Sequence, residues 1–183
     1  KAKGGDKEAT AQAAMIERAL KVVSEGKAAR MTAANNADEK KNLRELQLLT
    51  TKPIMYVCNV DEDSAAKGNA LSAKVMDMAK TRGAPCVVIS AKIEAEISML
   101  ETDAEKQDFL SAIGLDETGL ARIIKAGYGL LDLITYFTVG PKEARAWTIV
   151  KGTAAPAAAG VIHTDFEKGF IRAETIAYDD FVK

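Results

Sequence analysis

The chain has 183 residues, of which 48% are hydrophobic and 28% are charged, and its formal net charge is −1. A chain of this length buries about 70% of the surface that it exposes when unfolded, so it can fold without disulfides or metals. Its hydrophobic content excludes a disordered chain, and only four prolines and 13 glycines exclude a collagen-like one. No apolar run approaches the roughly 20 residues of a transmembrane helix, and the polar N-terminus does not resemble a signal peptide.

The charge is distributed unevenly along this near-neutral chain. Residues 1–49 carry ten Lys and Arg against seven Asp and Glu, whereas residues 50–131 carry nine against twelve. The small net charge argues against nucleic-acid binding driven by bulk electrostatics. Any contact with a polyanion is therefore expected to use the N-terminal segment.

With one histidine and two cysteines that lie far apart in the sequence, we expect no zinc site. Cys58 and Cys86 each lie within an apolar, strand-like run. We interpret them as buried, reduced thiols of a cytosolic protein, with a disulfide between them as the alternative. We expect no metal-binding residues in this chain.

The first region, residues 1–50, is expected to be helical. Apolar residues recur at alternating spacings of four and three, which is the pattern of a coiled-coil seam, at Ala9, Ala13, Ile16, Leu20 and Val23. Gly26 is a suitable end for this helix, because glycine commonly follows the last helical turn.

A second helix of this region is expected to begin after Asn36 or Asp38, either of which can cap it. Its apolar residues are Leu43, Leu46 and Leu49. Two helices joined by a loop predict an antiparallel coiled-coil hairpin. Two amphipathic helices on the surface of a domain are the alternative.

The second region, residues 51–131, changes to the pattern of α/β proteins. Two continuous apolar runs, residues 53–60 and 86–90, predict strands that are buried on both faces of a parallel sheet. The helix between them ends near Gly83, and its expected apolar face consists of Leu71, Val75, Met78 and Ala79. The resulting βαβ unit is expected to be parallel, and helices are expected over 104–113 and 120–131. Because two strands do not form an independent sheet, we interpret the unit as the last part of a larger doubly wound domain.

The third region, residues 132–183, predicts a small α+β domain. Its expected elements are a strand over 134–139, a turn over 140–142, a strand over 144–150, an Ala-rich helix over 154–162 and a strand over 170–174.

Polar residues end both strands of the βαβ unit, at the edge where open α/β sheets bind ligands. Asn59 ends the first strand, with Glu62 three residues later, and Ser90 with Ala91 ends the second. P-loop GTPases place a base-reading N-K-x-D loop and a Ser-Ala loop at these two positions. An Asp at the last N-K-x-D position accepts hydrogens from guanine N1 and N2, whereas adenine has an acceptor at N1. Glu at this position and the lost Lys therefore predict relaxed guanine selection.

Two other interpretations of this loop remain open. Asn59 can simply cap a turn through its side chain, and Glu62 with Asp63 can form a solvated acidic loop.

The motifs needed for phosphoryl transfer do not occur in the 183 residues. There is no G-x-x-x-x-G-K-[ST] to bind phosphates and no D-x-x-G motif on a strand. The chain is therefore expected to contact a base but not to hold a triphosphate and Mg²⁺. We predict no catalytic residue in it.

His163 and three aromatic residues of the third region have alternative explanations. A single His near Asp165, without a positioned Ser, is interpreted as structural or as a surface contact. Trp147, Phe166 and Phe170 could stack on RNA bases, or they could form the core of a small domain.

Several stretches of the chain resemble one family. KAGY at 125–128, LITYFTVG at 133–140, KEARAWTI at 142–149 and HTDFEKGFIRAE at 163–174 resemble the YchF and Obg-like ATPases, the last as a signature of their C-terminal TGS domain. The opening KAKGGDKE at 1–8 is similar to the start of the coiled-coil insertion of that family. The similarity extends over essentially the whole chain.

The resemblance implies a fold in three parts. Residues 51–131 would be the C-terminal part of a Ras-like, Obg-type α/β nucleotide-binding domain, interrupted by an α-helical coiled-coil hairpin at residues 1–50. Residues 132–183 would be a C-terminal α+β domain of the β-grasp (TGS) type, incomplete at its C-terminus. The P-loop, switch and metal-binding residues of the family would precede Lys1.

The resemblance also implies a function. It indicates a cytoplasmic, translation-associated P-loop NTPase that binds ATP, or GTP less selectively, together with Mg²⁺. Its partners would be the ribosome and RNA, with no membrane partner and no DNA sequence specificity. The base-side nucleotide-binding residues would be Asn59, Val60, Glu62, Ser90, Ala91 and Lys92.

Hydrolysis would then belong to the parent protein. The 183 residues alone are expected to be inactive and to bind no nucleotide tightly. The alternative is a non-enzymatic RNA- or ribosome-binding module built from the coiled coil and the TGS domain.

Overall fold

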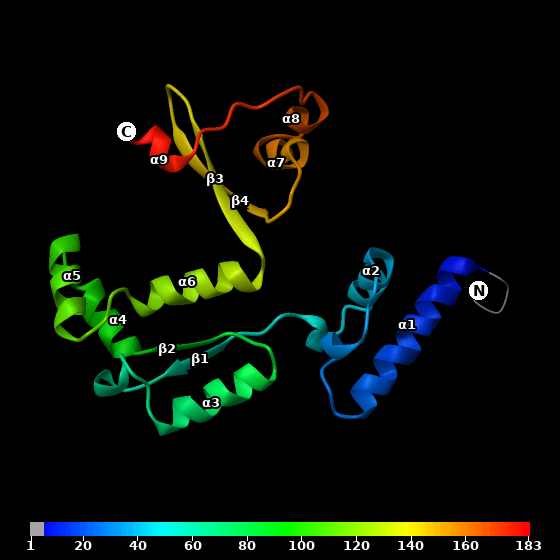
Figure 1. Cartoon of the computed structure of the whole chain (residues 1–183), viewed down its shortest axis with the longest axis horizontal. Helices are drawn as coiled ribbons and strands as arrows, with labels where there is room; N and C mark the ends of the chain where they lie inside the picture. Colours follow the sequence, from blue (N-terminus) through cyan, green and yellow to red (C-terminus); the bar gives the residue numbers. More distant parts are fainter. Residues whose placement is uncertain (1–5) are drawn as a thin grey trace. The chain divides into compact units, whose positions relative to one another are not determined.

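The computed structural model describes residues 6–183, so expectations for residues 1–5 lie outside the described residues (Figure 1). Short 3₁₀ turns lie at Ala29–Met31, Leu49–Thr51 and Glu62–Ser64. The helices and strands are, in chain order, α1 (Lys7–Ser24), α2 (Ala37–Glu45), β1 (Tyr56–Asn59), α3 (Ala70–Thr81), β2 (Cys86–Ile89), α4 (Ala91–Ser98), α5 (Asp103–Ala112), α6 (Gly119–Leu130), β3 (Leu133–Val139), β4 (Ala144–Val150), α7 (Ala155–Ile162), α8 (Thr164–Lys168) and α9 (Tyr178–Phe181).

The chain forms two compact units. One consists of the residues up to Tyr56 together with Lys74–Cys86, and the other consists of Val57–Ala73 together with Val87–Lys183. The three-part division expected from the sequence, with boundaries after residues 50 and 131, stays a prediction.

The expected βαβ unit is confirmed, but Val57 of β1 is 44% exposed, so the expected burial of this strand on both faces is wrong. Strands β1 and β2 are neighbours in a two-stranded sheet, with α3 between them in the chain. The Tyr56 N–H donates to the Pro85 carbonyl at 2.9 Å, and the Val60 N–H donates to the Ile89 carbonyl at 2.8 Å. The partners keep the same sequence offset in both bonds, so the strands run parallel.

The first helix begins at a side-chain cap and ends where the sequence predicts. The Asp6 side chain caps α1 by accepting from the Glu8 N–H at 3.0 Å and the Ala9 N–H at 3.1 Å. Gly26 follows the helix with φ of +74°, a conformation that glycine adopts without steric cost.

The predicted apolar seam of α1 is wrong in register. The buried cluster of this unit consists of Met15 and Ala19 from α1 with Leu43 from α2. Ile16, Leu20 and Val23 of the predicted seam are 47%, 63% and 46% exposed. The buried side is thus rotated by one residue, because Met15 fits against α2 and is completely buried there.

The second predicted helix is shorter than expected. Asn36 caps it by accepting from the Glu39 N–H at 2.8 Å, as one of the two expected caps. The helix ends at Glu45, and Leu49 lies in a 3₁₀ turn with 79% of its surface exposed. The coiled-coil character of the α1–α2 pair stays a prediction.

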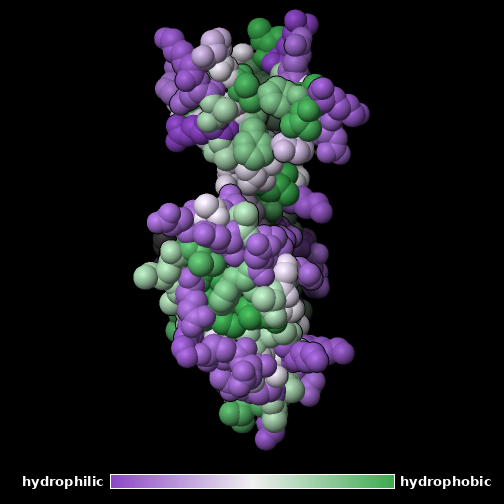
Figure 2. All heavy atoms as spheres, turned by 90° about the vertical axis from the view of Figure 1, so that its left-hand side faces the viewer, coloured by the Kyte–Doolittle hydropathy of each residue, from purple (hydrophilic) through white to green (hydrophobic). Residues whose placement is uncertain are grey.

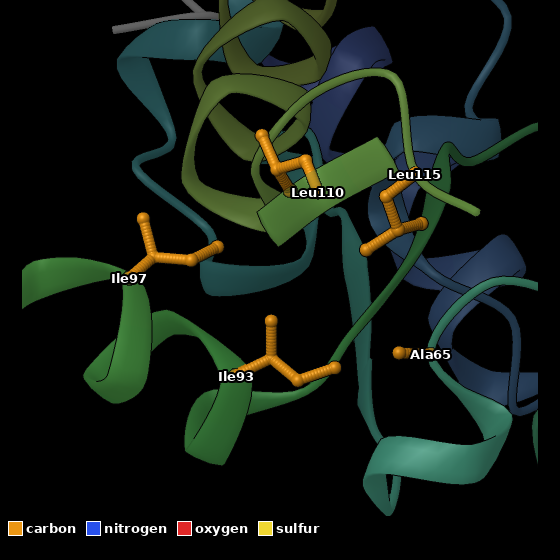
Figure 3. Packing of buried hydrophobic residues seen from close by; sticks show 5 residues of the cluster. All are labelled: Ala65, Ile93, Ile97, Leu110 and Leu115. Carbon is orange, nitrogen blue, oxygen red and sulfur yellow. The ribbon is translucent and has the colours of Figure 1, made fainter. Parts of the chain in front are cut away.

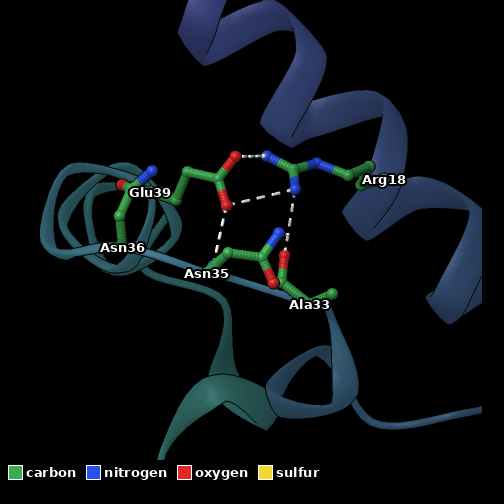
Figure 4. A network of polar contacts seen from close by, with 5 residues as sticks. All are labelled: Arg18, Ala33, Asn35, Asn36 and Glu39. Atoms are coloured by element: carbon green, nitrogen blue, oxygen red, sulfur yellow. Dashed lines mark hydrogen bonds and ion pairs between the residues drawn. The ribbon is translucent and has the colours of Figure 1, made fainter.

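A polar network joins α1 to the start of α2 (Figure 4). Arg18 donates to Glu39 through Nη2 at 2.7 Å and Nη1 at 3.3 Å, and Nη1 also donates to the Ala33 carbonyl at 3.2 Å. The Asn35 N–H donates to Glu39 Oε2 at 2.8 Å. The hydrogen bonds from Arg18 first, and from Asn35 second, lower the pKa of the Glu39 carboxyl.

The expected hairpin of the third region is confirmed. Strands β3 and β4 pair antiparallel, with Leu133 opposite Val150 and Val139 opposite Ala144. The Gly140 N–H donates to the Glu143 carbonyl at 2.9 Å and closes the turn. The Tyr136 hydroxyl donates to the Ala158 carbonyl at 2.8 Å and joins the hairpin to α7.

The strand expected over residues 170–174 is not formed. The chain leaves α8 at Gly169 and continues without helix or strand until α9. Ile171, which the pattern placed in a strand, is 91% exposed. A strand needs a neighbour to accept and donate its backbone hydrogen bonds, and no strand of the described residues pairs with this segment.

Helix α4, which the sequence pattern did not predict, supplies the core of the second unit (Figure 3). Its Ile93 and Ile97 are 3% and 5% exposed. They form a buried cluster with Ala65, Leu110 and Leu115.

Glu94 of the same helix fixes the start of α6. Its two carboxylate oxygens accept from the Gly119 N–H at 2.7 Å and the Leu120 N–H at 3.1 Å. A Cβ at Gly119 would lie 2.8 Å from Ile89 Cγ2 and 2.9 Å from Glu94 Oε1, so the close approach requires glycine.

Apolar side chains also remain at the surface, and Figure 2 shows one face on which they lie between hydrophilic ones. In the hairpin, Phe137, Val139 and Val150 are 65%, 60% and 53% exposed. The strand register places these three on the same face of the hairpin. Among residues 6–183, no helix has both the length and the apolarity needed to span a lipid bilayer.

Substituting Gly119 tests the close packing of the start of α6 against Ile89 of β2 and Glu94 of α4. We expect Gly119→Ala to lower the free energy of unfolding by about 1–3 kcal/mol, because the added methyl group meets the branched Ile89 side chain. Gly127→Ala is the matched control in the same helix, since its Cβ would meet nothing within 4 Å. Urea denaturation should show the control to be neutral or stabilised by up to about 1 kcal/mol. Equal urea concentrations at the midpoint of unfolding for the two variants would contradict the packing argument.

Substituting Glu39 tests the network between α1 and α2. Its carboxyl pKa is lower in the folded chain, so its contribution is present above the ordinary carboxyl pKa and disappears as the pH falls through the folded value. We expect Glu39→Gln to lower the melting temperature at pH 7 and to approach wild type only as the pH falls below the lowered carboxyl pKa of folded Glu39. Glu45→Gln, whose carboxylate lies 3.7 Å from Lys41 Nζ at an exposed position, should have the smaller effect at pH 7. A pH-independent difference would exclude the carboxylate as its cause.

Candidate nucleotide-base site

The structure brings the carboxyl ends of β1 and β2 together through hydrogen bonds. Val60 extends the pairing of the strands through its bond to Ile89, and one residue earlier the Asn59 side chain crosses to the next loop. Asn59 Oδ1 accepts from the Ala91 N–H at 2.9 Å. Asn59 therefore ties the two loops together, rather than only capping its own turn.

A second contact between the loops is ionic. Lys92 Nζ, at the start of α4, forms an ion pair with Glu62 Oε1 in the 3₁₀ turn after β1. The Asp61 side chain caps this turn by accepting from the Ser64 N–H at 2.9 Å. The side chain of Glu62 is 39% exposed and that of Lys92 is 69% exposed, so solvent reaches both partners. The expected acidic loop is thus solvated, but its Glu62 has a specific cationic partner.

The pair keeps both groups charged. The hydrogen bond from Lys92 is the largest cause that lowers the pKa of the Glu62 carboxyl, and the same bond raises the pKa of the Lys92 ammonium. Glu62 is therefore a carboxylate at neutral pH and acts only as an acceptor.

Ser90 connects β2 to α4 at this edge. It is 2% exposed, and its hydroxyl has no hydrogen-bond partner within the described residues. Ser90 precedes α4 without capping it through its side chain, while the Ala91 N–H is taken by Asn59. A buried hydroxyl without a partner is uncommon and is available to a group that enters the site.

All six residues expected on the base side lie in two segments, 59–62 and 90–92, which two contacts connect directly. The arrangement offers a carboxylate acceptor, an ammonium donor and a buried hydroxyl within one edge of the sheet. These groups suit the edge of a purine base, which carries both donors and acceptors. Their role in nucleotide binding stays a prediction.

Glu94 is the residue at this edge that the sequence reasoning missed. It belongs to α4, and it connects the loop at 90–92 to the first turn of α6. The pattern that could have revealed α4 is Ser90 as a helix-starting residue, followed by Ile93 and Ile97 one turn apart.

The other polar and aromatic candidates lie outside this site. His163 caps α8, since its Nδ1 accepts from the Asp165 N–H at 3.2 Å, which supports the structural interpretation. Arg145 lies 4.2 Å from the centroid of the Trp147 ring, and Trp147 Nε1 donates to Thr138 Oγ1 at 2.9 Å. Phe166 is 54% exposed and so is not a core residue.

Comparison with known proteins agrees with these features. Residues 133–183 match the family model YchF-GTPase_C, described as "Protein of unknown function (DUF933)". The "Ribosome-binding ATPase YchF" of Haemophilus ducreyi is 50% identical over 183 residues, which cover 100% of this chain and 50% of that protein. The protein of the same name from Escherichia coli O157:H7 is 48% identical over 182 residues, covering 100% of this chain and 49% of that protein.

The chain is homologous to the YchF proteins. A solved structure, the YchF GTPase of Schizosaccharomyces pombe, matches with a TM-score of 0.76 at 34% identity and covers 86% of this chain and 42% of that chain. This homology confirms the resemblance found in the sequence. The chain spans about half the length of the curated YchF relatives that it matches.

Substituting Asn59 tests the connection between the two loops. Asn59→Ala removes the acceptor of the Ala91 N–H, so we expect hydrogen exchange at this amide to accelerate about fivefold. Asn59→Asp keeps an oxygen at the same position and should preserve most of the protection. NMR-detected exchange measures both variants. Unchanged protection in Asn59→Ala would show that the bond does not hold the loop.

Proposed function

We propose that this chain is the base-reading and C-terminal part of a YchF-type nucleotide-binding ATPase that associates with the ribosome. The observation that carries the proposal is the connected edge of β1 and β2, where Asn59 bonds to Ala91 and Glu62 pairs with Lys92. The relatives support the proposal, because two proteins named ribosome-binding ATPases are 50% and 48% identical to this chain over its whole length.

In this proposal each region has a separate task. Residues 51–131 form the C-terminal part of the nucleotide-binding domain, residues 1–50 form its coiled-coil insertion, and residues 132–183 belong to a TGS domain. Asn59, Val60, Glu62, Ser90, Ala91 and Lys92 contact the base. Glu62 replaces the Asp of guanine-specific loops, so ATP is accepted and GTP is bound less selectively.

Hydrolysis requires phosphate- and metal-binding residues that these 183 residues do not contain. ATP, or GTP, with Mg²⁺ would be held by a P-loop segment of the same protein. When bound, Mg²⁺ would neutralise phosphate charge during transfer, and the residues of this chain would orient the base. The site of action in this proposal is the cytoplasm.

One observation favours a second candidate, a non-enzymatic module that binds RNA or the ribosome. Arg145 stacks on Trp147 on the hairpin, and a guanidinium next to an aromatic ring is a common arrangement for contacting bases and phosphates. In that case, the chain alone would bind ribosomes without any nucleotide.

The test compares the 183-residue chain alone with the longer protein that contains its P-loop segment. We expect no ATP turnover and no tight nucleotide binding by the chain alone, and both activities in the longer protein. Calorimetric titration and a phosphate-release assay measure them. Turnover by the chain alone would contradict the division of tasks, and no nucleotide binding by the longer protein would contradict the proposed function.

Ribosome pelleting distinguishes the second candidate. The leading proposal expects pelleting of the longer protein to change between its ATP-bound and nucleotide-free forms. Pelleting of the chain alone that is independent of nucleotide and falls steeply with salt would favour the non-enzymatic module.

A further inference from the structure

Lys92, at the start of α4, contacts the carboxylate of Glu62 in the 3₁₀ turn after β1. Its Nζ contacts Glu62 Oε1, which is one of the two oxygens of the carboxylate. The other charged groups that act on the pair are weaker: Glu96 attracts Lys92, and Asp61 repels Glu62. The hydrogen bond between Lys92 and Glu62 is the largest effect on either partner.

The backbone on both sides of this contact is fixed. Ala91, directly before Lys92, is bonded to Asn59, and Ile93, directly after it, is 3% exposed in the core. Glu62 begins a 3₁₀ turn that Asp61 caps. The ammonium and the carboxylate therefore meet because both loops are held in place, although their side chains are exposed.

The number of free carboxylate oxygens matters for the choice of base. Guanine presents two adjacent donors, N1–H and N2–H, and a carboxylate with both oxygens free can accept from both. Adenine has an acceptor at N1 and no amino group at position 2, so the same carboxylate gains nothing there. A carboxylate that is already held through one oxygen loses part of its advantage for guanine and loses little for adenine.

We propose that Lys92 is a positioning residue for base specificity: by holding one oxygen of Glu62, it weakens the acceptance of both guanine donors by the carboxylate and so favours adenine nucleotides. The inference rests on the proposed function, because it assumes that this edge receives the base. It concerns the lysine at this position and not the replacement of Asp by Glu, which changes the reach of the carboxylate but not the number of its free oxygens.

The experiment measures the affinities of ADP and GDP in the longer protein that contains this chain and its P-loop segment. Displacement of a fluorescent nucleotide gives both dissociation constants without turnover. We expect Lys92→Met to lower the ratio of the GDP constant to the ADP constant by about two- to fivefold, the range for an exposed ion pair. Lys67→Met is the matched control, because Lys67 lies in the exposed loop before α3 and should leave the ratio unchanged.

A second background tests whether Lys92 acts through Glu62. In Glu62→Gln the carboxylate is absent, so adding Lys92→Met should change the ratio no further. A ratio that stays constant in Lys92→Met while both nucleotides still bind would overturn the role of Lys92 and leave the proposed function intact. An equal shift in the Glu62→Gln background would overturn the action through Glu62. Failure of the wild-type protein to bind either nucleotide would overturn the proposed function and, with it, this inference.

Discussion

Two hydrogen bonds at the carboxyl ends of β1 and β2 hold the candidate site together. Val60 donates to Ile89, and the Asn59 side chain accepts from Ala91. Both bonds need the strands to be parallel and in register, since a shift by one residue would direct Asn59 to the opposite face of the sheet. The contact between Glu62 and Lys92 forms only because the backbone is already fixed in this way.

Helix α4 connects the paired ends of β1 and β2 to the C-terminal part of its unit. It begins at Ala91, directly after Ser90, and its Ile93 and Ile97 enter the buried cluster. Its Glu94 bonds to the first two amides of α6, and α6 leads into the hairpin strand β3. A displacement of the loop at 90–92 would therefore be opposed by core packing and by two charge-assisted hydrogen bonds.

The sequence predicted those features whose signals are local. The two apolar runs became β1 and β2, the turn expected over 140–142 closed the β3–β4 hairpin, and Asn36 capped α2. Local patterns failed where a partner decides the outcome. The face of α1 that becomes buried depended on how Met15 fits against Leu43, and the segment at 170–174 did not become a strand because no described strand pairs with it.

For the candidate site, too, the sequence predicted the local features but not the contacts between distant residues. Its residue types and spacing, N-x-x-E after one strand and Ser-Ala-Lys after the next, were readable from the sequence because each lies at the end of an apolar run. The contacts between these groups could not be predicted from the sequence, because each joins residues 25 or more positions apart. They are the contacts of Asn59 with Ala91, of Glu62 with Lys92 and of Glu94 with α6. By itself, the sequence determined which chemical groups stand at this edge and which family the chain resembles. Only the tertiary structure decided which of these groups meet, since pairing across parallel strands depends on register and helix packing that no single segment encodes.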